Sequence, residues 1–199
     1  MITTVVFDIG NVLVHYDWKS YVDSFGFSEE KSQAIANAMF LSEDWNEMDR
    51  GVLTIEECIA RFISNAPEYA EDIPRVLAGM GACIKQCAYT KPWIRELREK
   101  GLRVYFLSNY GAYALEATKP ELDFRSWMDG GLFSYEVQLI KPSRWIYAEF
   151  CRRFRVNPEE AVFFDDNEKN IVSARDFGMN AFVFTTYEKA CEELKALGI

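Results

Sequence analysis

Histidine is almost absent from this chain, because His15 is the only one among 199 residues. A zinc site made of Cys and His side chains needs about four ligands, which one histidine and a scattered set of cysteines do not offer. The five cysteines are Cys58, Cys83, Cys87, Cys151 and Cys191. An odd number at irregular spacing is equally unsuited to a disulfide framework. The composition therefore argues against both kinds of site and predicts reduced thiols that pack as small apolar side chains.

Basic residues are also few. The chain has 22 Lys and Arg against 31 Asp and Glu, which gives a net charge of −9. Its longest basic cluster is Arg152-Arg153 with Arg155. Binding to nucleic acid by release of counterions needs a whole basic face. Nucleic acid is therefore not an expected partner.

Long apolar runs are missing as well. No run approaches the roughly 18 residues of a membrane-spanning helix. The N-terminus, from Met1 to Asp8, lacks the basic start and the cleavable apolar stretch of a secretory signal. We therefore expect a cytoplasmic protein without a membrane partner. Nothing in the sequence determines its oligomeric state.

What the sequence does contain is a regular alternation of short apolar runs and helical patterns. Hydrophobic residues make up 49% of the chain, enough for one full-sized core. The predicted strands, apolar on both faces, are 5–7, 102–107, 161–164 and 181–184. The predicted helices are 92–100, 143–154, 168–177 and 187–197. Strands that alternate with helices in this way predict an α/β fold, with a parallel sheet covered by helices on both faces.

One long stretch, residues 18–89, interrupts the alternation. It contains no convincing strand but several helix starts, such as Ser28 and Ser42 before acidic residues. Thr54 and Glu57 form a capping-box pattern. An all-helical block inserted after the first strand predicts a lid over the carboxyl edge of the sheet. We therefore predict a core of residues 1–17 and 90–199 and a helical cap of residues 18–89.

Three of the predicted strands end in polar residues. Asp8 ends the first, Ser108 and Asn109 end the second, and Asp165 and Asp166 end the third. Ligands of open parallel sheets bind where such ends meet. Carboxylates gathered there repel one another unless a cation neutralises them, and hard oxygen ligands favour Mg²⁺. These residues predict a magnesium site.

A positive charge accompanies this edge. Lys141 precedes Pro142 at the start of a predicted helix, where its mobile ammonium group can hold a phosphate against the metal. The Ser108 hydroxyl and the Asn109 amide can donate to the same oxygens. The predicted ligand is therefore a small phosphorylated metabolite.

The order of these residues resembles that of the haloacid dehalogenase-like hydrolase superfamily, over nearly the whole chain. The family has a nucleophilic Asp after the first strand, a Ser or Thr after the second, a later Lys and a late acidic pair. The corresponding segments here are Phe7-Asp8-Ile9-Gly10-Asn11-Val12-Leu13-Val14, Leu107-Ser108-Asn109, Ile140-Lys141-Pro142 and Phe164-Asp165-Asp166-Asn167. Four motifs in order are far more specific than any one alone. The resemblance implies a Rossmann-like core, a helical cap between the first two motifs, and phosphatase activity.

The resemblance also implies a role for each residue that meets the phosphate. Asp8 would attack phosphorus and become a transient aspartyl phosphate, while Ser108 and Lys141 bind the transferring phosphoryl group. Asn11, within the first motif, and Asn109 are expected beside the phosphate. Such a site suits phosphoryl transfer, which depends on alignment and on neutralising the equatorial oxygens.

The metal ligands follow from the same resemblance. Mg²⁺ would be held by the Asp8 carboxylate, the main-chain carbonyl of Gly10 and Asp166, with Asp165 supporting from behind or through water. One ion bridges its ligands at about 2 Å per bond, so Asp8 and Asp166 must lie within about 8 Å of each other.

Gly10 departs from the family pattern. Most phosphatases of this superfamily have a second Asp there, which protonates the leaving oxygen and later activates water. A positioned general acid is worth about 10²–10⁴-fold in rate. We predict Asp17 as the replacement, because a carboxyl in a partly closed pocket has a raised pKa. The alternatives are that Asp17 caps a helix and that His15 is a hydrogen-bonded hinge residue.

A good leaving group needs less help from an acid. Anomeric oxygens of sugar 1-phosphates, phenols and acyl groups leave readily, and the Asp-x-Gly-Asn segment is similar to that of the α-D-glucose-1-phosphatase branch. We therefore expect a small sugar phosphate as the substrate. Tyr16, Trp18 and Trp45 either stack on the sugar or form the core of the cap. The tryptophans expected to pack between sheet and helices are Trp93, Trp127 and Trp145.

The expected function is that of a Mg²⁺-dependent phosphomonoester hydrolase. One alternative within the same fold is a non-catalytic module that binds a sugar phosphate or a phosphoprotein. The other is a 2-haloacid dehalogenase, whose relatives use an Asp nucleophile without a metal. Transfer of the phosphoryl group to an alcohol instead of water also stays open.

Overall fold

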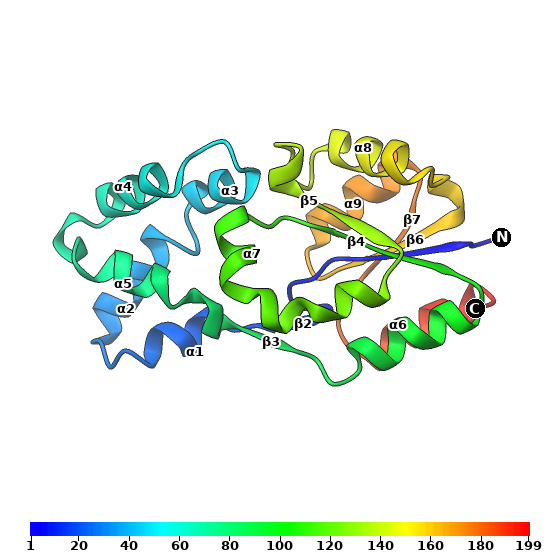
Figure 1. Cartoon of the computed structure of the whole chain (residues 1–199), viewed down its shortest axis with the longest axis horizontal. Helices are drawn as coiled ribbons and strands as arrows, with labels where there is room; N and C mark the ends of the chain where they lie inside the picture. Colours follow the sequence, from blue (N-terminus) through cyan, green and yellow to red (C-terminus); the bar gives the residue numbers. More distant parts are fainter.

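A parallel sheet of five strands, in the order β5-β4-β1-β6-β7, forms the centre of one half of the molecule (Figure 1). The computed structural model describes all 199 residues of the chain. The strands are β1 (Thr4–Phe7), β4 (Arg103–Ser108), β5 (Gly130–Phe133), β6 (Ala161–Asp165) and β7 (Asn180–Val183). The predicted α/β class is confirmed, and β1 is the central strand.

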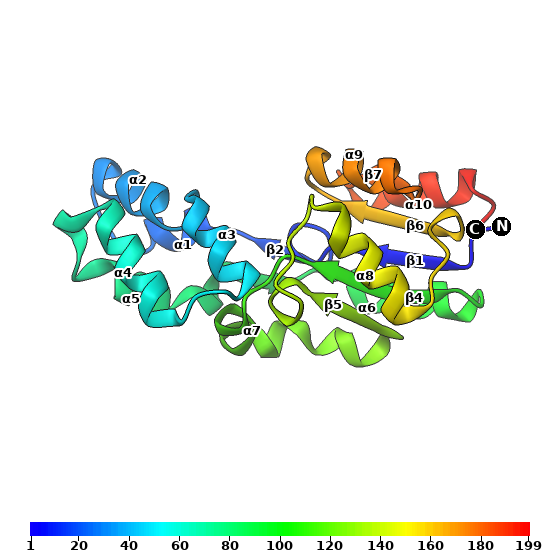
Figure 2. The same cartoon turned by 90° about the horizontal axis from the view of Figure 1, so that it is seen from above.

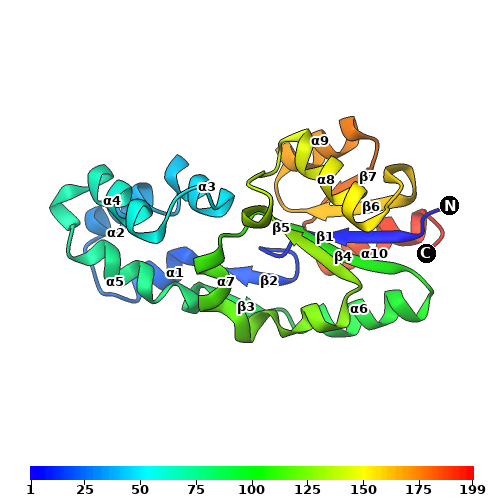
Figure 3. The ribbon, with the colours of Figure 1, turned by 45° about the horizontal axis from the view of Figure 1, so that its top comes forward.

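Side chains of β1 alternate between two apolar layers. Val5 and Phe7 pack in the layer that contains Trp93, whereas Val6 packs in the layer that contains Tyr147. Successive side chains of a strand point to opposite faces, so both faces need helices. The first face is covered by α6 (Thr90–Glu99) and α10 (Tyr187–Ala196), and the second by α8 (Arg144–Phe154) and α9 (Glu168–Phe177), as Figure 3 shows.

The register of the central strands brings their carboxyl ends together. Phe7 lies opposite Phe106 of β4 and opposite Phe164 of β6. The amide of the next residue, Asp8, still donates to the Phe164 carbonyl at 2.8 Å. Asp8 therefore leaves the sheet level with the last residue of β6 and one residue before the end of β4.

A group of helices lies beyond these carboxyl ends, separated from the sheet in the view of Figure 2. The helices are α1 (Trp18–Asp23), α2 (Glu29–Ala38), α3 (Glu43–Arg50), α4 (Ile55–Asn65) and α5 (Asp72–Ala78), with short 3₁₀ turns η1 (Pro67–Tyr69) and η2 (Met80–Cys83). Side chains of Ser28 and Ser42 cap α2 and α3, and Thr54 and Glu57 form the predicted capping box. Division of the chain into a core and a cap of residues 18–89 remains our proposal.

Two short strands that the sequence did not reveal connect the cap to the sheet. β2 (Val14–Tyr16) pairs antiparallel with β3 (Ile84–Gln86). The expectation that residues 18–89 contain no strand is therefore wrong at β3. A strand of three residues is too short to show a two-residue period, and only pairing with a distant segment defines it.

The sheet edge holds another strand that was not predicted. β5 begins with Gly130 and Gly131, which lower the intrinsic preference for a strand. Gly131 is nevertheless required, because a Cβ atom there would lie 2.2 Å from the Phe106 ring. Close packing against β4 thus explains a glycine that looks unfavourable in isolation. Between β4 and α8 the chain also forms α7 (Ala112–Thr118), η3 (Lys119–Trp127) and η4 (Ser134–Glu136).

The cysteines behave as predicted. All five are free, and all except Cys191 are buried. Burial raises the pKa of Cys83 to about 12 and that of Cys151 to about 11. Buried thiols of this kind stay protonated and act as apolar side chains.

None of the helices has both the length and the apolar content that crossing a bilayer requires.

Three tryptophans were expected to pack against the sheet, and only one does. Trp93 is 1% exposed, but Trp127 and Trp145 are 39% and 64% exposed. Trp145 lies at the second position of α8, before the apolar face of that helix begins. The expectation is therefore wrong for Trp127 and Trp145.

The two kinds of tryptophan predict different stability losses. Trp93→Ala removes a fully buried ring and should lower the free energy of unfolding by about 3–5 kcal/mol. Trp145→Ala removes an exposed ring and should change it by less than about 0.5 kcal/mol. Urea unfolding followed by circular dichroism measures both, and equal losses would contradict the packing described here.

Candidate functional site

Three carboxyl groups meet at the carboxyl ends of β1 and β6. Oxygen atoms of Asp8, Asp165 and Asp166 all lie within 4.8 Å of one another. Asp8 and Asp165 are buried, and Asp166 is exposed. Asp8 and Asp166 therefore lie well within the limit of about 8 Å for ligands that share one ion.

Lys141 lies between two of these carboxylates. Its ammonium nitrogen is 3.0 Å from Asp8 Oδ1 and 2.5 Å from Asp165 Oδ2, and its side chain is 1% exposed. Burial disfavours the charge of Lys141, but the carboxylates of Asp165 and Asp8 outweigh it and raise its pKa above the ordinary value. Lys141 is therefore a permanent buried cation.

The same surroundings set the protonation of Asp8. Burial raises the pKa of Asp8, Lys141 lowers it, and Asp165 raises it, with a net pKa of about 6. Hydrogen bonds from the Ser108 hydroxyl and the Lys141 ammonium group contribute to this net pKa by lowering it. At neutral pH most Asp8 carboxyls are ionised, as a nucleophile requires.

Asp165 is bound on all sides by the protein. Its oxygens accept hydrogen bonds from the Asn170 amide at 3.0 Å, from the Asn167 main-chain N–H at 2.8 Å, and from Lys141. Its side chain is fully buried. This saturation suits the supporting position expected for Asp165 better than direct coordination of an ion.

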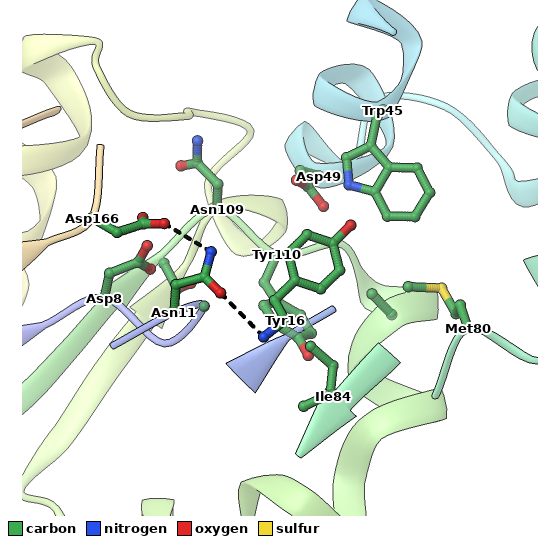
Figure 4. Close-up of a pocket in the computed structure, with 13 residues that line it drawn as sticks. Asp8, Asn11, Tyr16, Trp45, Asp49, Met80, Ile84, Asn109, Tyr110 and Asp166 are labelled. Atoms are coloured by element: carbon green, nitrogen blue, oxygen red, sulfur yellow. Dashed lines mark hydrogen bonds between the residues drawn. The ribbon is translucent and has the colours of Figure 1, made fainter. Parts of the chain in front are cut away.

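Asn11 holds the first and last motifs together. Its amide nitrogen donates to Asp166 Oδ2 at 2.8 Å, and its amide oxygen accepts from the Tyr16 N–H at 3.2 Å (Figure 4). Burial raises the pKa of Asp166, and the hydrogen bond from Asn11 lowers it. The structure thus makes Asn11 an orienting residue for Asp166, and its predicted contact with phosphate stays a prediction.

The Asn109 side chain holds the backbone of Lys141 through two hydrogen bonds. Its side-chain nitrogen donates to the Lys141 carbonyl at 3.0 Å, and its side-chain oxygen accepts from the Lys141 N–H at 2.8 Å. One amide hydrogen remains for a ligand. Ser108 is 2% exposed and, like Asn109, borders a cavity between the carboxylates and the cap.

A cavity of about 270 Å³ extends from the carboxylates into the cap. Figure 4 shows Asp8, Asn11 and Asp166 at one end and Trp45, Met80 and Ile84 at the other. Ser108 and Gly10 also border the polar end, and Tyr110 and Ala114 also border the cavity. The volume is near the lower end of the range for small-molecule sites. The cavity therefore suits a small ligand with one charged end and one apolar end.

Two of the three aromatic residues proposed for substrate contact border this cavity. They are Tyr16 and Trp45. Trp18 does not line it, and stacks on Phe40 with ring centroids 5.7 Å apart. Trp18 is therefore part of the cap core.

Asp17 does not lie where an acid is needed. It is the N-cap of α1, its Oδ1 accepts from the Ser20 N–H at 2.9 Å, and it does not line the cavity. Its hydrogen bonds to Ser20 lower its pKa. The expectation of a raised pKa for Asp17 is therefore wrong, and the alternative of a helix cap is confirmed. His15 is exposed on β2, where its backbone pairs with that of Lys85.

Asp49 is the acidic residue that the sequence did not single out. It is 9% exposed, belongs to α3, and borders the same cavity as Asp8. The available signal was its spacing, since Asp49 follows Trp45 by four residues and shares its helix face. Several other acids in the same helix hid this signal, because only the fold shows which of them is buried.

Comparisons with known proteins agree with this geometry. A family model described as haloacid dehalogenase-like hydrolase matches residues 2–178. A sesquiterpene phosphatase of Aspergillus oryzae is 24% identical over 193 residues, which cover 96% of this chain and 94% of the relative. A drimenol cyclase of Aspergillus calidoustus is 25% identical over 197 residues, which cover 98% of this chain but 36% of that longer protein.

A solved structure has the same fold. It is that of a HAD family enzyme from Bacteroides thetaiotaomicron, in complex with magnesium and inorganic phosphate. It superposes with a TM-score of 0.73 at 22% identity, over 94% of this chain and 96% of that chain. None of these comparisons singles out the α-D-glucose-1-phosphatase branch.

The buried position of Lys141 predicts a large effect on stability. Lys141→Met leaves Asp8 and Asp165 without their shared cation and, in EDTA, should lower the free energy of unfolding by about 3–5 kcal/mol. The control is Lys189→Met, which removes an exposed ion pair to Glu192 and should cost less than about 1 kcal/mol. Urea unfolding at pH 7 measures both, and a loss no larger for Lys141 than for Lys189 would contradict the buried ion pairs.

Proposed function

The chain belongs to the haloacid dehalogenase-like hydrolase family, and from this premise we propose that it hydrolyses phosphate monoesters of small alcohols with the help of Mg²⁺. One observation carries the proposal. An ionised and buried carboxylate, Asp8, borders a cavity together with Asp166 and a buried hydroxyl, Ser108. Buried Lys141 contacts Asp8 directly. A nucleophile, a cation site and donors for an anion thus meet at one point.

The residues present fit a magnesium ion. Carboxylate oxygens within 4.8 Å of one another are close enough for one ion to bridge at about 2 Å per bond. We propose that Asp8, the Gly10 carbonyl and Asp166 hold it, with Asp165 in support. When bound, Mg²⁺ supplies positive charge that neutralises the carboxylates and the phosphoryl oxygens.

The chain's own residues then account for the reaction. An oxygen of Asp8 forms a bond to phosphorus while the bond from phosphorus to the ester oxygen breaks. Lys141 and Ser108 donate hydrogen bonds to the phosphoryl oxygens, and Asn109 holds the Lys141 backbone in place. Water then attacks the aspartyl phosphate, which releases inorganic phosphate and restores the Asp8 carboxylate.

Electrostatics favour this reaction over halide displacement. A 2-haloacid is an anion, and the cluster of Asp8, Asp165 and Asp166 would repel it unless a cation were present. A non-catalytic binding module is also less favoured. Binding alone needs no buried nucleophile, whereas the pKa of Asp8, about 6, keeps it ionised at neutral pH.

Two classes of alcohol are candidates for the substrate. The sugar phosphate expected from the leaving-group argument is supported by the aromatic rings of Tyr16 and Trp45 at the cavity. Beyond the polar groups of Tyr16, Asp49 and Tyr110, however, its hydroxyls would meet Met80, Ile84 and Ala114, which offer no side-chain partner. An ester with an apolar body fits this end better, and a relative is named a sesquiterpene phosphatase. We therefore favour the apolar class.

The reaction itself is tested with p-nitrophenyl phosphate. Release of nitrophenolate should depend on Mg²⁺, stop in EDTA, and fall to the uncatalysed background in Asp8→Asn. The exposed variant Asp17→Asn should keep the wild-type rate. Metal-independent release, or undiminished release by Asp8→Asn, would contradict the proposal.

The substrate class is tested with alkyl phosphates of increasing length beside glucose 1-phosphate. Each CH₂ group that enters the cavity should raise kcat/KM about fourfold, because its burial is worth about 0.8 kcal/mol. Trp45→Ala should weaken this dependence on length, and Trp18→Ala, outside the cavity, should not. A higher kcat/KM for glucose 1-phosphate than for every alkyl phosphate would favour the sugar class instead.

A further inference from the structure

The proposed reaction leaves one chemical need unmet. An ordinary alcohol departs from phosphorus as a strongly basic alkoxide unless an acid protonates it. Gly10 has no side chain to do so, and Asp17 lies outside the cavity with a lowered pKa. Another acid must therefore reach the ester oxygen.

Asp49 is an acid that borders the same cavity as Asp8. It borders the cavity from the cap side, whereas Asp8 borders it from the sheet (Figure 4). One of its oxygens, Oδ1, accepts from the Gly111 N–H at 3.1 Å. The other oxygen, Oδ2, has no hydrogen-bond partner in the protein and is not fully buried. Asp49 can therefore hold a proton on Oδ2 and present it to a ligand.

The backbone around Asp49 is fixed against the sheet domain. Its carbonyl accepts from the Ser134 hydroxyl at 2.5 Å, and Ser134 in turn accepts from the Tyr110 N–H at 2.8 Å. Gly111 lets the backbone of α3 approach the core closely, because a Cβ atom at position 111 would lie 2.7 Å from the Met48 carbonyl oxygen. The cap thus docks on the core at the residue that carries the carboxyl group.

The surroundings of Asp49 favour its protonated form. Burial raises the pKa of Asp49, the Gly111 hydrogen bond lowers it, and the charge of Asp8 raises it, to a net pKa of about 7. The Lys141 charge opposes this increase only in part. A carboxyl with a pKa near the working pH can give and take a proton in one cycle.

We propose that Asp49 is the general acid and base of the reaction, in place of the missing side chain at position 10; this rests on the function proposed above. In the first step Asp8 bonds to phosphorus, the bond from phosphorus to the ester oxygen breaks, and the Oδ2 proton of Asp49 moves to that oxygen. In the second step Asp49 takes a proton from water as the water oxygen bonds to phosphorus and the Asp8–phosphorus link breaks. Protons balance over the two steps.

Two rivals for the role are present nearby. The Tyr16 hydroxyl is the one buried side-chain polar atom without a partner, and burial, with the charge of Asp49, raises its pKa well above the ordinary value. The Tyr110 hydroxyl already pairs with Thr118 at 2.7 Å. Both are weaker acids than Asp49, so their variants serve as alternatives in the test.

The experiment compares two substrates with similar bodies and different leaving groups. p-Nitrophenyl phosphate releases a stable phenolate, whereas p-nitrobenzyl phosphate releases an ordinary alcohol. Because kcat/KM reports the steps up to departure of the alcohol, Asp49→Asn should lower it about 10²–10⁴-fold for the benzyl ester and less than about threefold for the phenyl ester. Retained activity on the phenyl ester also shows that the variant is folded.

Gly10 offers a rescue. A Cβ atom on Gly10 meets no atom within 4 Å, so a side chain can begin there without displacing a neighbour. The double variant Gly10→Asp, Asp49→Asn should have a kcat/KM for the benzyl ester at least about tenfold higher than that of Asp49→Asn alone. The control Asp17→Asn should leave the ratio of kcat/KM for the benzyl ester to kcat/KM for the phenyl ester unchanged.

The outcomes separate the two proposals. If the wild type hydrolyses neither ester with Mg²⁺, the proposed function itself fails. If the wild type is active but Asp49→Asn changes kcat/KM for both esters by the same factor, Asp49 is not the acid. The same conclusion follows if Tyr16→Phe or Tyr110→Phe, instead of Asp49→Asn, lowers kcat/KM for the benzyl ester alone.

Discussion

The ion pairs of buried Lys141 are the interaction on which the rest of the site depends. Asp8 and Asp165 are adjacent because parallel strands end at the same level, and two buried carboxylates at that distance repel strongly. Lys141 contacts both and is itself held by Asn109. The fold can therefore keep the Asp8 carboxylate ionised although it is buried.

The junction between cap and core is the second constraint, and it connects chemistry to specificity. Ser134 and Gly111 hold α3 so that Asp49 and Trp45, four residues apart, face one cavity. One helix thus supplies both an acidic group and an apolar wall. The missing Asp at position 10 first suggested a substrate with a good leaving group. If Asp49 is the acid, as we propose, that restriction no longer applies, and the shape and polarity of the cavity would select the alcohol.

Much of the fold could be predicted from the sequence, because its signals are local. Helices α9 and α10 begin where their patterns begin, and the capping box of Thr54 and Glu57 forms as expected. The prediction of strands failed where pairing or packing with a distant segment determines the local structure. β3 exists only because it pairs with β2, and Gly131 belongs to a strand only because the Phe106 ring leaves no room for a side chain.

The sequence by itself determined the family resemblance and the convergence of Asp8, Ser108 and the late acidic pair, since these residues stand at the carboxyl ends of β1, β4 and β6. Lys141 follows no strand, and its place beside them was expected from the order of the motifs. The sequence could not determine which cap residue meets them. Asp17 is near Asp8 in the chain but faces solvent, whereas Asp49 is distant and borders the cavity. Only the packing of the cap on the core decides this, because the direction of a side chain on a cap helix depends on how that helix docks.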